Sequence, residues 1–172
     1  MAGRLNDAPA PIAPTPAEWR AAMAYFPSGV TIVTTWDGEE PVGSTINAFC
    51  SVSLDPPLLL ICVDLKNPIR RPLEAAGIFG VNILHEEGRP IAHRFARDPL
   101  SDRFCELPYR AAPGGAPQLE AAPVFIDCVV ESIHAAGDHL IAVGRGRRIE
   151  HTVGVAPLLY HKGQFLKLVL HG

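Results

Sequence analysis

The sequence feature that most constrains the fold is the apolar run Leu58–Val63, which follows Asp55-Pro56-Pro57 directly. Six consecutive apolar residues are typical of a strand that is buried on both faces. Proline lacks a backbone N–H, so the two prolines interrupt any helix or central strand at this junction. The preceding segment, from Gly43 to Ser53, is rich in small and hydroxyl-bearing residues. Such a segment beside an apolar strand could hold a planar polar ligand, although a hairpin with a polar outer face fits the same residues.

Strand and turn signals alternate along the chain. The β-branched and aromatic segment Val30–Trp36 is followed by Asp37-Gly38, a hairpin turn signal, and Val42–Phe49 is expected to return as the partner strand. Further strands are expected over residues 78–84, 124–133, 140–149, 158–160 and 165–170. Alternating strands with tight turns and two or three short helices predict a mainly β fold, a closed antiparallel barrel.

Three short helices are expected, over about residues 15–27, 67–76 and 87–96. In the first, Thr15 is a favourable N-cap. In the second, Asn67 is a favourable N-cap, Pro68 occupies the first helical position and Gly77 ends the helix. The free backbone N–H groups at the start of this second helix would suit a phosphate.

The composition is that of a globular chain. Its 172 residues are enough for one domain with a sizeable core, and we expect an Ala/Pro-rich leader over 1–17 and a single domain over 18–172. Apolar residues make up 48% of the chain and charged residues 19%, a balance that favours a buried subunit interface. The net charge of -3, without a basic patch, disfavours nucleic-acid binding. No apolar run approaches the roughly 20 residues that a membrane-spanning helix needs.

The four cysteines, at positions 50, 62, 105 and 128, show no paired short spacing. They fit reduced, mostly buried thiols better than a zinc site or a disulfide framework, so we expect no metal. Residues 1–17 lack the basic start and apolar core of a signal peptide. Together these observations predict a cytoplasmic protein.

The segment Asp98–Leu119 is polar and rich in proline and glycine, and it predicts one long loop. Loops of this length in a compact domain are commonly lids or partner surfaces. The sequence contains neither the G-x-S-x-G motif of hydrolases nor the G-x-G-x-x-G fingerprint of a dinucleotide fold. We therefore expect no catalytic acid, base or nucleophile.

Six motifs occur along roughly residues 18–169 in a characteristic order. They are Phe26-Pro27-Ser28-Gly29-Val30-Thr31-Ile32-Val33-Thr34-Thr35, then the segment from Gly43 to Val63, then Phe79-Gly80-Val81-Asn82-Ile83-Leu84, Arg94-Phe95-Ala96, Gly137-Asp138-His139 and Pro157-Leu158-Leu159-Tyr160-His161-Lys162-Gly163. On these motifs the chain resembles the flavin reductase family. Its members are small flavin-binding split-barrel proteins that often supply reduced flavin to a partner monooxygenase.

The resemblance implies a reaction and its participants. Hydride would pass from the nicotinamide C4 of NADH or NADPH to the N5 of FMN or FAD. Because both reacting centres belong to cofactors, the protein would stack and orient them and tune the flavin through hydrogen bonds. The resemblance also implies an FMN-binding split barrel, a homodimer with flavin at its interface and a possible monooxygenase partner.

The resemblance further assigns roles to individual residues. The isoalloxazine ring is expected against Ser44, Thr45, Ile46, Asn47 and Ala48, and the ribityl chain against Phe49, Cys50 and Ser51. The path toward the phosphate is expected along Cys62, Val63, Asp64, Lys66 and Asn67, with Asn82, Arg94 and Phe95 completing that end. His139 and Tyr160 are expected on the nicotinamide side. A surface role for Arg94 and a solvated turn for His139 fit the sequence as well.

Two other functions are compatible with the same motifs. A split-barrel relative could reduce another acceptor, such as a corrinoid, through bound flavin. A flavin-binding carrier or sensor without turnover is the alternative from a different class. The motif Gly137-Asp138-His139 favours turnover with a nicotinamide, whereas Lys66–Ile69 replaces the segment rich in Ser and Thr that family members often carry. The sequence motifs fit FMN and FAD equally.

Overall fold

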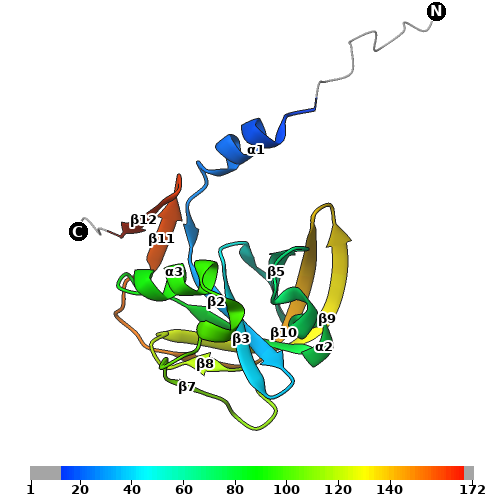
Figure 1. Ribbon diagram of the computed structural model, residues 1–172, viewed down its shortest axis with the longest axis vertical. Helices are drawn as coiled ribbons and strands as arrows, with labels where there is room; N and C mark the ends of the chain where they lie inside the picture. Colours follow the sequence, from blue (N-terminus) through cyan, green and yellow to red (C-terminus); the bar gives the residue numbers. More distant parts are fainter. Residues whose placement is uncertain (1–12, 169–172) are drawn as a thin grey trace, which may run out of the picture.

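The computed structural model describes residues 13–168 and shows a mainly β protein with three α-helices (Figure 1). The helices are α1 (Pro16–Met23), α2 (Arg70–Ala76) and α3 (Arg89–Arg97), with a 3₁₀ turn η1 (Leu100–Asp102). The strands are β1 (Ser28–Gly29), β2 (Thr31–Asp37), β3 (Glu40–Ile46), β4 (Phe49–Leu54), β5 (Pro57–Asp64), β6 (Ile78–Ile83), β7 (Tyr109–Arg110), β8 (Gln118–Leu119), β9 (Val124–Ala136), β10 (His139–His151), β11 (Leu158–His161) and β12 (Gln164–Lys167). The prediction of a mainly β fold is confirmed.

The strands form antiparallel sheets whose order differs from the order of the chain. The largest sheet has seven strands in the order β3-β2-β6-β9-β10-β5-β4. A second sheet has the order β1-β11-β12, and β7 pairs with β8. β3 and β4 therefore form the two edges of the large sheet, although only residues 47–48 separate them in the chain. The long hairpin β9–β10 extends beyond the rest of the sheet in Figure 1.

Strand β2 is buried on both faces. Ile32 packs in one core cluster together with Phe95 of α3, and Val33 packs in the other together with Leu73 of α2. Successive side chains of a strand point to opposite faces, so the two helices cover opposite sides of the sheet. The threonines of β2 are buried too, and Thr34 and Thr35 donate hydrogen bonds to backbone carbonyls.

The expectation that Leu58–Val63 is buried on both faces is wrong. In β5 the side chains of Leu59, Ile61 and Val63 are buried, and those that alternate with them are half-buried. The partner of β5 on one side is β4, an edge strand whose residues Val52 and Leu54 are exposed. One row of apolar side chains of β5 therefore packs into the core, and the apolar row on its other face is only half-buried.

Several predicted element boundaries are wrong: the third helix begins at Arg89 instead of residue 87, and β9 and β10 extend beyond the expected ranges 124–133 and 140–149. Val42–Phe49 is not one strand, since β3 ends at Ile46 and Phe49 begins β4. The second helix begins at Arg70 instead of Asn67, with Ile69 as its N-cap. Asn67 caps a turn, because its side-chain oxygen accepts from Ile69 N at 3.1 Å and its backbone N–H donates to Asp64. Gly77 ends the helix with φ 65°, as predicted.

Helix α1 stands away from the sheets in Figure 1. Its predicted start is confirmed: Thr15 caps it, Pro16 begins it, and Glu18 completes a capping box. The helix ends at Met23 and buries none of its own residues. Trp19 and Met23 are 59% and 52% exposed, so an apolar surface of α1 is open in the single chain. α1 begins within the expected leader, and residues 1–12 of that leader lie outside the described residues, as do residues 169–170 of the last expected strand.

The long segment from Asp98 to Leu119 is held against the body of the protein. Arg94 of α3 donates to the carbonyl oxygens of Asp102 and Cys105. Arg103 is only 6% exposed, and its guanidinium donates to Gly43 O at 2.7 Å and to Asp98 O at 3.0 Å. Burial lowers the pKa of Arg103, opposed by the nearby Asp98 carboxylate. These bonds tie the first half of the predicted loop to α3 and β3.

The cysteines are less buried than expected. Cys128 is buried, Cys62 is half-buried, and Cys50 and Cys105 are exposed. Within residues 13–168, none of these thiols forms a disulfide, and the side chains there make no cluster able to hold a metal ion. None of the described helices is long and apolar enough to cross a membrane.

Candidate functional site

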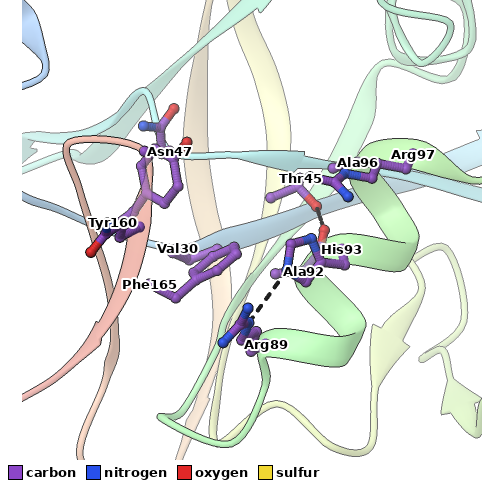
Figure 2. A pocket seen from close by; sticks show the side chains of 12 residues that line it. Val30, Thr45, Asn47, Arg89, Ala92, His93, Ala96, Arg97, Tyr160 and Phe165 are labelled. Carbon is purple, nitrogen blue, oxygen red and sulfur yellow. Dashed lines mark hydrogen bonds between the residues drawn. The ribbon is translucent and has the colours of Figure 1, made fainter.

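A cavity of about 790 Å³ lies between β3, α3 and the hairpin β11–β12 (Figure 2). Its lining comes from segments far apart in the sequence: Val30, Thr45, Asn47, Arg89, Ala92, His93, Ala96, Arg97, Tyr160, Gly163, Gln164 and Phe165. The volume is in the range of small-molecule and cofactor sites. Two arginines and a histidine contribute to this lining, and no aspartate or glutamate does. The cavity is therefore suited to an anionic ligand.

The wall on the α3 side carries Arg89, His93 and Arg97, spaced four residues apart on one face of the helix. The Arg89 Nε–H donates to His93 Nε2 at 3.4 Å. On the hairpin side, Phe165 packs edge-on against His93 and Tyr160, with ring centroids 5.0 and 5.3 Å apart. The Arg89 guanidinium carbon lies 5.9 Å from the centre of the Phe165 ring, so cationic and aromatic side chains meet on this side of the cavity (Figure 2).

The β3 side of the cavity supplies hydrogen-bonding groups. The Thr45 hydroxyl donates to Ala92 O at 2.7 Å, which fixes α3 against β3 and leaves the hydroxyl oxygen able to accept. The exposed Asn47 amide donates to Ser28 Oγ at 3.3 Å. Of the residues that the sequence proposed for flavin and nicotinamide, Thr45, Asn47 and Tyr160 lie here together.

A second group of expected residues meets at the turn after β5. The Asn67 amide donates to Ser44 Oγ at 3.0 Å, and Asp64 Oδ1 accepts from Lys66 N at 2.7 Å. Ser44 is buried against this turn, whereas its neighbour Thr45 points toward α3, because adjacent strand residues face opposite sides. β3 therefore connects this turn to the cavity.

His139 lies beside the same turn. It is the partner of Asp64 in the pairing of β10 with β5, and Leu65 N donates to Asp138 O at 3.0 Å. The His139 Nδ1 atom lies 2.7 Å from Asp138 Oδ1, and this hydrogen bond holds the pKa of the exposed Asp138 carboxyl below its usual value. The two residues expected on the nicotinamide side thus occupy different places, His139 at this turn and Tyr160 in the cavity.

Two expected contacts lie in the core instead. Asn82 is fully buried, and its amide donates to Ile32 O at 3.0 Å and to Thr34 Oγ1 at 3.1 Å. Its oxygen accepts from Leu119 N at 2.8 Å. Phe95 is fully buried against Phe104, with ring centroids 5.1 Å apart. Both side chains therefore belong to the core, and neither lines the cavity.

The remaining expected residues lie along β3, β4 and β5. Phe49, Cys50 and Ser51 lie on the edge strand β4, and Cys50 and Ser51 are exposed. Ile46 and Val63 are buried, and Ala48 is exposed in the connection between β3 and β4, where its carbonyl accepts from Cys62 N at 2.9 Å. Burial raises the pKa of the Cys62 thiol, and nearby Cys50 raises it further. Arg94 uses its guanidinium on loop carbonyls.

Sequence reasoning missed nine of the twelve lining residues, and five of these carry polar or aromatic side chains: Arg89, His93, Arg97, Gln164 and Phe165. The signal for three of them was present, because positions 89, 93 and 97 recur at a spacing of four and share a helix face. Gln164 and Phe165 enter only because β12 folds back toward α3, an arrangement that no local pattern shows.

Comparisons with known proteins agree with this arrangement. The family model described as "Flavin reductase like domain" matches residues 23–168, most of the chain. The chain belongs to the flavin reductase family. A curated member, the flavin-dependent monooxygenase reductase subunit HsaB of Rhodococcus jostii (strain RHA1), is 38% identical over 151 residues, 87% of this chain and 76% of that protein.

Further flavin reductases resemble the chain over nearly their full length. An NADH-dependent flavin reductase of Rhodococcus sp is 38% identical over 164 residues, 92% of this chain and 89% of that one. The solved NADH:FAD oxidoreductase SgcE6 of Streptomyces globisporus C-1027 has a TM-score of 0.86 at 31% identity, covering 94% of this chain and 99% of its own. SgcE6 was also solved in complex with NAD and FAD fragments, with a TM-score of 0.83 at 31% identity, covering 89% and 92% of the two chains.

Proposed function

We propose that this protein is an NADH-dependent flavin reductase that reduces FMN or FAD and supplies the reduced flavin to a partner monooxygenase. The observation that carries the proposal is the cavity beside α3, which combines cationic, aromatic and amide groups without a carboxylate. Such a lining fits the nucleotides of this reaction, whose rings need stacking and directional hydrogen bonds and whose phosphates carry negative charge. The relatives named as reductases and as reductase subunits of monooxygenases support the same activity.

A bound flavin would supply the redox chemistry, as acceptor of the hydride that the nicotinamide nucleotide would donate. The protein binds and orients the reactants. The segment from Ser44 to Ser51 offers hydroxyl, amide and backbone groups to the ring and the ribityl chain, and the exposed Asn47 carries its one side-chain amide. The segment from Cys62 to Asn67 offers backbone groups to the phosphate, and His139 beside it offers a ring nitrogen to the nicotinamide.

We further infer a closed split barrel formed by one domain over residues 18–172. The bond from Asn67 to Ser44 supports closure, since it joins the segment after β5 to β3 from opposite ends of the large sheet. A homodimer is supported by the open apolar surfaces of α1 and β4, which include Trp19 and Leu54. A cytoplasmic location is supported by the free cysteines.

The test begins with a visible absorbance spectrum of the purified protein. NADH oxidation at 340 nm is then followed while FMN and FAD are titrated in separately. A flavin band together with flavin-dependent NADH oxidation supports the reductase. Flavin binding without NADH oxidation would refute the reductase and favour a flavin carrier or sensor. NADH oxidation that requires a corrinoid acceptor would refute flavin reduction as the activity and favour a corrinoid reductase.

A further inference from the structure

We propose that Arg103, in the long segment after α3, is a positioning residue that fixes the free edge of β3 for the flavin ring. The inference rests on the proposed function, because that function assigns the ring to the segment from Ser44 to Ser51. Arg103 lies outside this segment and does not line the cavity beside α3. It acts on the flavin only through the backbone of β3.

The guanidinium of Arg103 joins two segments that are distant in the chain. Arg103 follows the 3₁₀ turn η1 and is almost fully buried. Its Nη1 group donates to Gly43 O of β3 at 2.7 Å, and its Nε–H donates to Asp98 O, at the end of α3, at 3.0 Å. A guanidinium is planar and holds its donors in a fixed fork. Arg103 therefore sets the distance between β3 and the end of α3.

The bond to Gly43 lies on the open side of β3. Among the described strands, β2 is the only one that pairs with β3. Backbone groups of alternate residues in such an edge strand point away from the sheet. The direction at Gly43 follows from β2, where Leu84 N donates to Val30 O, so that Val33 faces β3 and pairs there with Ser44. Gly43 and Thr45, on either side of Ser44, therefore point outward.

This orientation leaves the backbone of Thr45 for a ligand. The outward carbonyl of Gly43 is occupied by Arg103, whereas the outward N–H and C=O of Thr45 lie two residues farther along the same edge. A planar ring that carries donors and acceptors can pair with such an edge in the way that another strand would. The position of this edge then decides how well the ring pairs.

Helix α3 holds β3 on a second side. An added Cβ at Gly43 would lie 2.7 Å from the Phe95 ring, so the strand and the helix are in close contact there. The Thr45 hydroxyl donates to Ala92 O at 2.7 Å. Arg103 fixes the edge of residues 43–45, and α3 fixes their face. A backbone that is held in place before the ligand arrives binds it at a lower entropic cost.

The charge of Arg103 supports this role. Within the described residues, no carboxylate lies within 4.0 Å of its guanidinium, although burying an unpaired cation is costly. A neutral side chain could donate to one carbonyl at a smaller cost of burial. Charge-assisted donation to two carbonyls at once is what the guanidinium adds. A rigid link between Gly43 and Asp98 accounts for a cation at this position.

The test compares the full-length protein with Arg103→Gln and Arg103→Lys. The lysine keeps a charged donor for Gly43 O and lacks a second nitrogen for Asp98 O. Arg147→Gln is the control for loosening the same long segment, because Arg147 donates to Gly114 O and Asp127 at 3.0 Å, away from β3. Gly144→Ala is the stability control, because its added Cβ would lie 2.4 Å from the core ring of Phe79.

Four measurements are made on each protein. Dissociation constants for riboflavin, FMN and FAD are measured by flavin fluorescence, and KM and kcat by NADH oxidation. Hydrogen exchange of the peptide that covers residues 43–47 is followed by mass spectrometry without flavin. A melting curve checks that each variant is folded.

We expect Arg103→Gln to bind all three flavins at least about tenfold more weakly, by a common factor, because they share the ring. The KM for flavin should rise by the same factor while kcat changes less than threefold, since Arg103 touches no reacting atom. Arg103→Lys should lose about three- to fivefold, and both controls should stay within twofold. Exchange in residues 43–47 should rise at least fivefold in Arg103→Gln and stay unchanged in Gly144→Ala.

Three results would overturn the proposal. One is a loss of affinity for FMN and FAD without a loss for riboflavin, which would place Arg103 on the phosphate. Another is an equal loss of flavin affinity in Gly144→Ala, which would make the effect one of general stability. The third is an unchanged flavin affinity in Arg103→Gln or, if that variant does not fold, in Arg103→Lys.

The exchange measurement separates this proposal from the proposed function, because it involves neither flavin nor hydride transfer. A local rise of exchange in Arg103→Gln, in a protein that binds no flavin, would refute the reductase and still show that Arg103 fixes β3. Flavin-dependent NADH oxidation, together with unchanged exchange and flavin affinity in Arg103→Gln, would support the reductase and refute the role of Arg103.

Discussion

Replacing Asn82 by alanine tests whether this residue serves the core or the flavin. The resemblance implied that Asn82 lies near the flavin, whereas the structure buries it completely between β2, β6 and β8. Its amide makes three hydrogen bonds, at 2.8 to 3.1 Å, to Ile32 O, Thr34 Oγ1 and Leu119 N. We expect Asn82→Ala to destabilise the protein strongly and to leave the flavin affinity of the folded protein within twofold.

The magnitude follows from these three bonds. Losing the two bonds that the amide donates costs about 0.5–1.5 kcal/mol each. The Leu119 N–H is left buried without an acceptor, which costs about 1–3 kcal/mol more. The expected loss in the free energy of unfolding is therefore about 4 kcal/mol. For a chain of 172 residues this corresponds to a fall in melting temperature of about 8–16 °C.

Urea unfolding followed by circular dichroism measures this loss, and hydrogen exchange locates it. The amide of Leu119 should lose protection first, because Asn82 accepts its hydrogen bond. Flavin affinity is measured in parallel, below the unfolding transition. Asn47→Ala is the matched control: its amide is exposed, so stability should change by less than about 0.5 kcal/mol while flavin binding weakens severalfold. A variant Asn82→Ala of normal stability with tenfold weaker flavin binding would refute the reasoning.

Three further measurements test the core and the site. Gly144→Ala should lower the free energy of unfolding in urea by about 1–3 kcal/mol, because the added Cβ would lie 2.4 Å from the Phe79 ring. Gly146→Ala is the control and should leave the stability unchanged, because the nearest atom to its added Cβ is 3.8 Å away. Equal losses of stability in the two variants would contradict this reasoning. Burial raises the pKa of Cys128 to about 12, so a thiol reagent at pH 8 should label the exposed cysteines and spare Cys128 until the protein unfolds. His139→Ala should raise the KM for NADH severalfold with flavin affinity within twofold, and a parallel loss of flavin affinity would rule out its nicotinamide role.

The raised pKa of Cys128 also predicts that the folded state loses stability at high pH. The folded protein holds this proton to about pH 12, whereas the unfolded chain releases it near the ordinary value of 9.0. The unfolded state therefore binds fewer protons above pH 9, so the contribution of Cys128 to stability is complete below that pH and is lost as the pH rises toward 12.

Local signals in the sequence determined most of the strands, the antiparallel class and the family. Asp37-Gly38 marked the first hairpin, Gly77 the end of α2 and Thr15 the start of α1, because turns and caps depend on the conformations that a few adjacent residues can adopt. The motifs that indicated a flavin reductase are equally local, since each is a short run of neighbouring residues. Turns, helix caps and short motifs can therefore be identified before the packing of the chain is known.

The tertiary structure alone decided which side chains face the ligand. β2 is buried on both faces and β5 on one, because α2 and α3 happen to cover opposite sides of β2. Asn82 looked like a ligand contact and is a core residue, since β8 brings Leu119 to its oxygen. Arg89 and Arg97 of α3 were not singled out from the sequence, and they line a cavity because β12 returns to face them. Each of these features depends on pairing between segments that are distant in the chain. The stability of such a pairing depends on both partners, so neither segment predicts it alone.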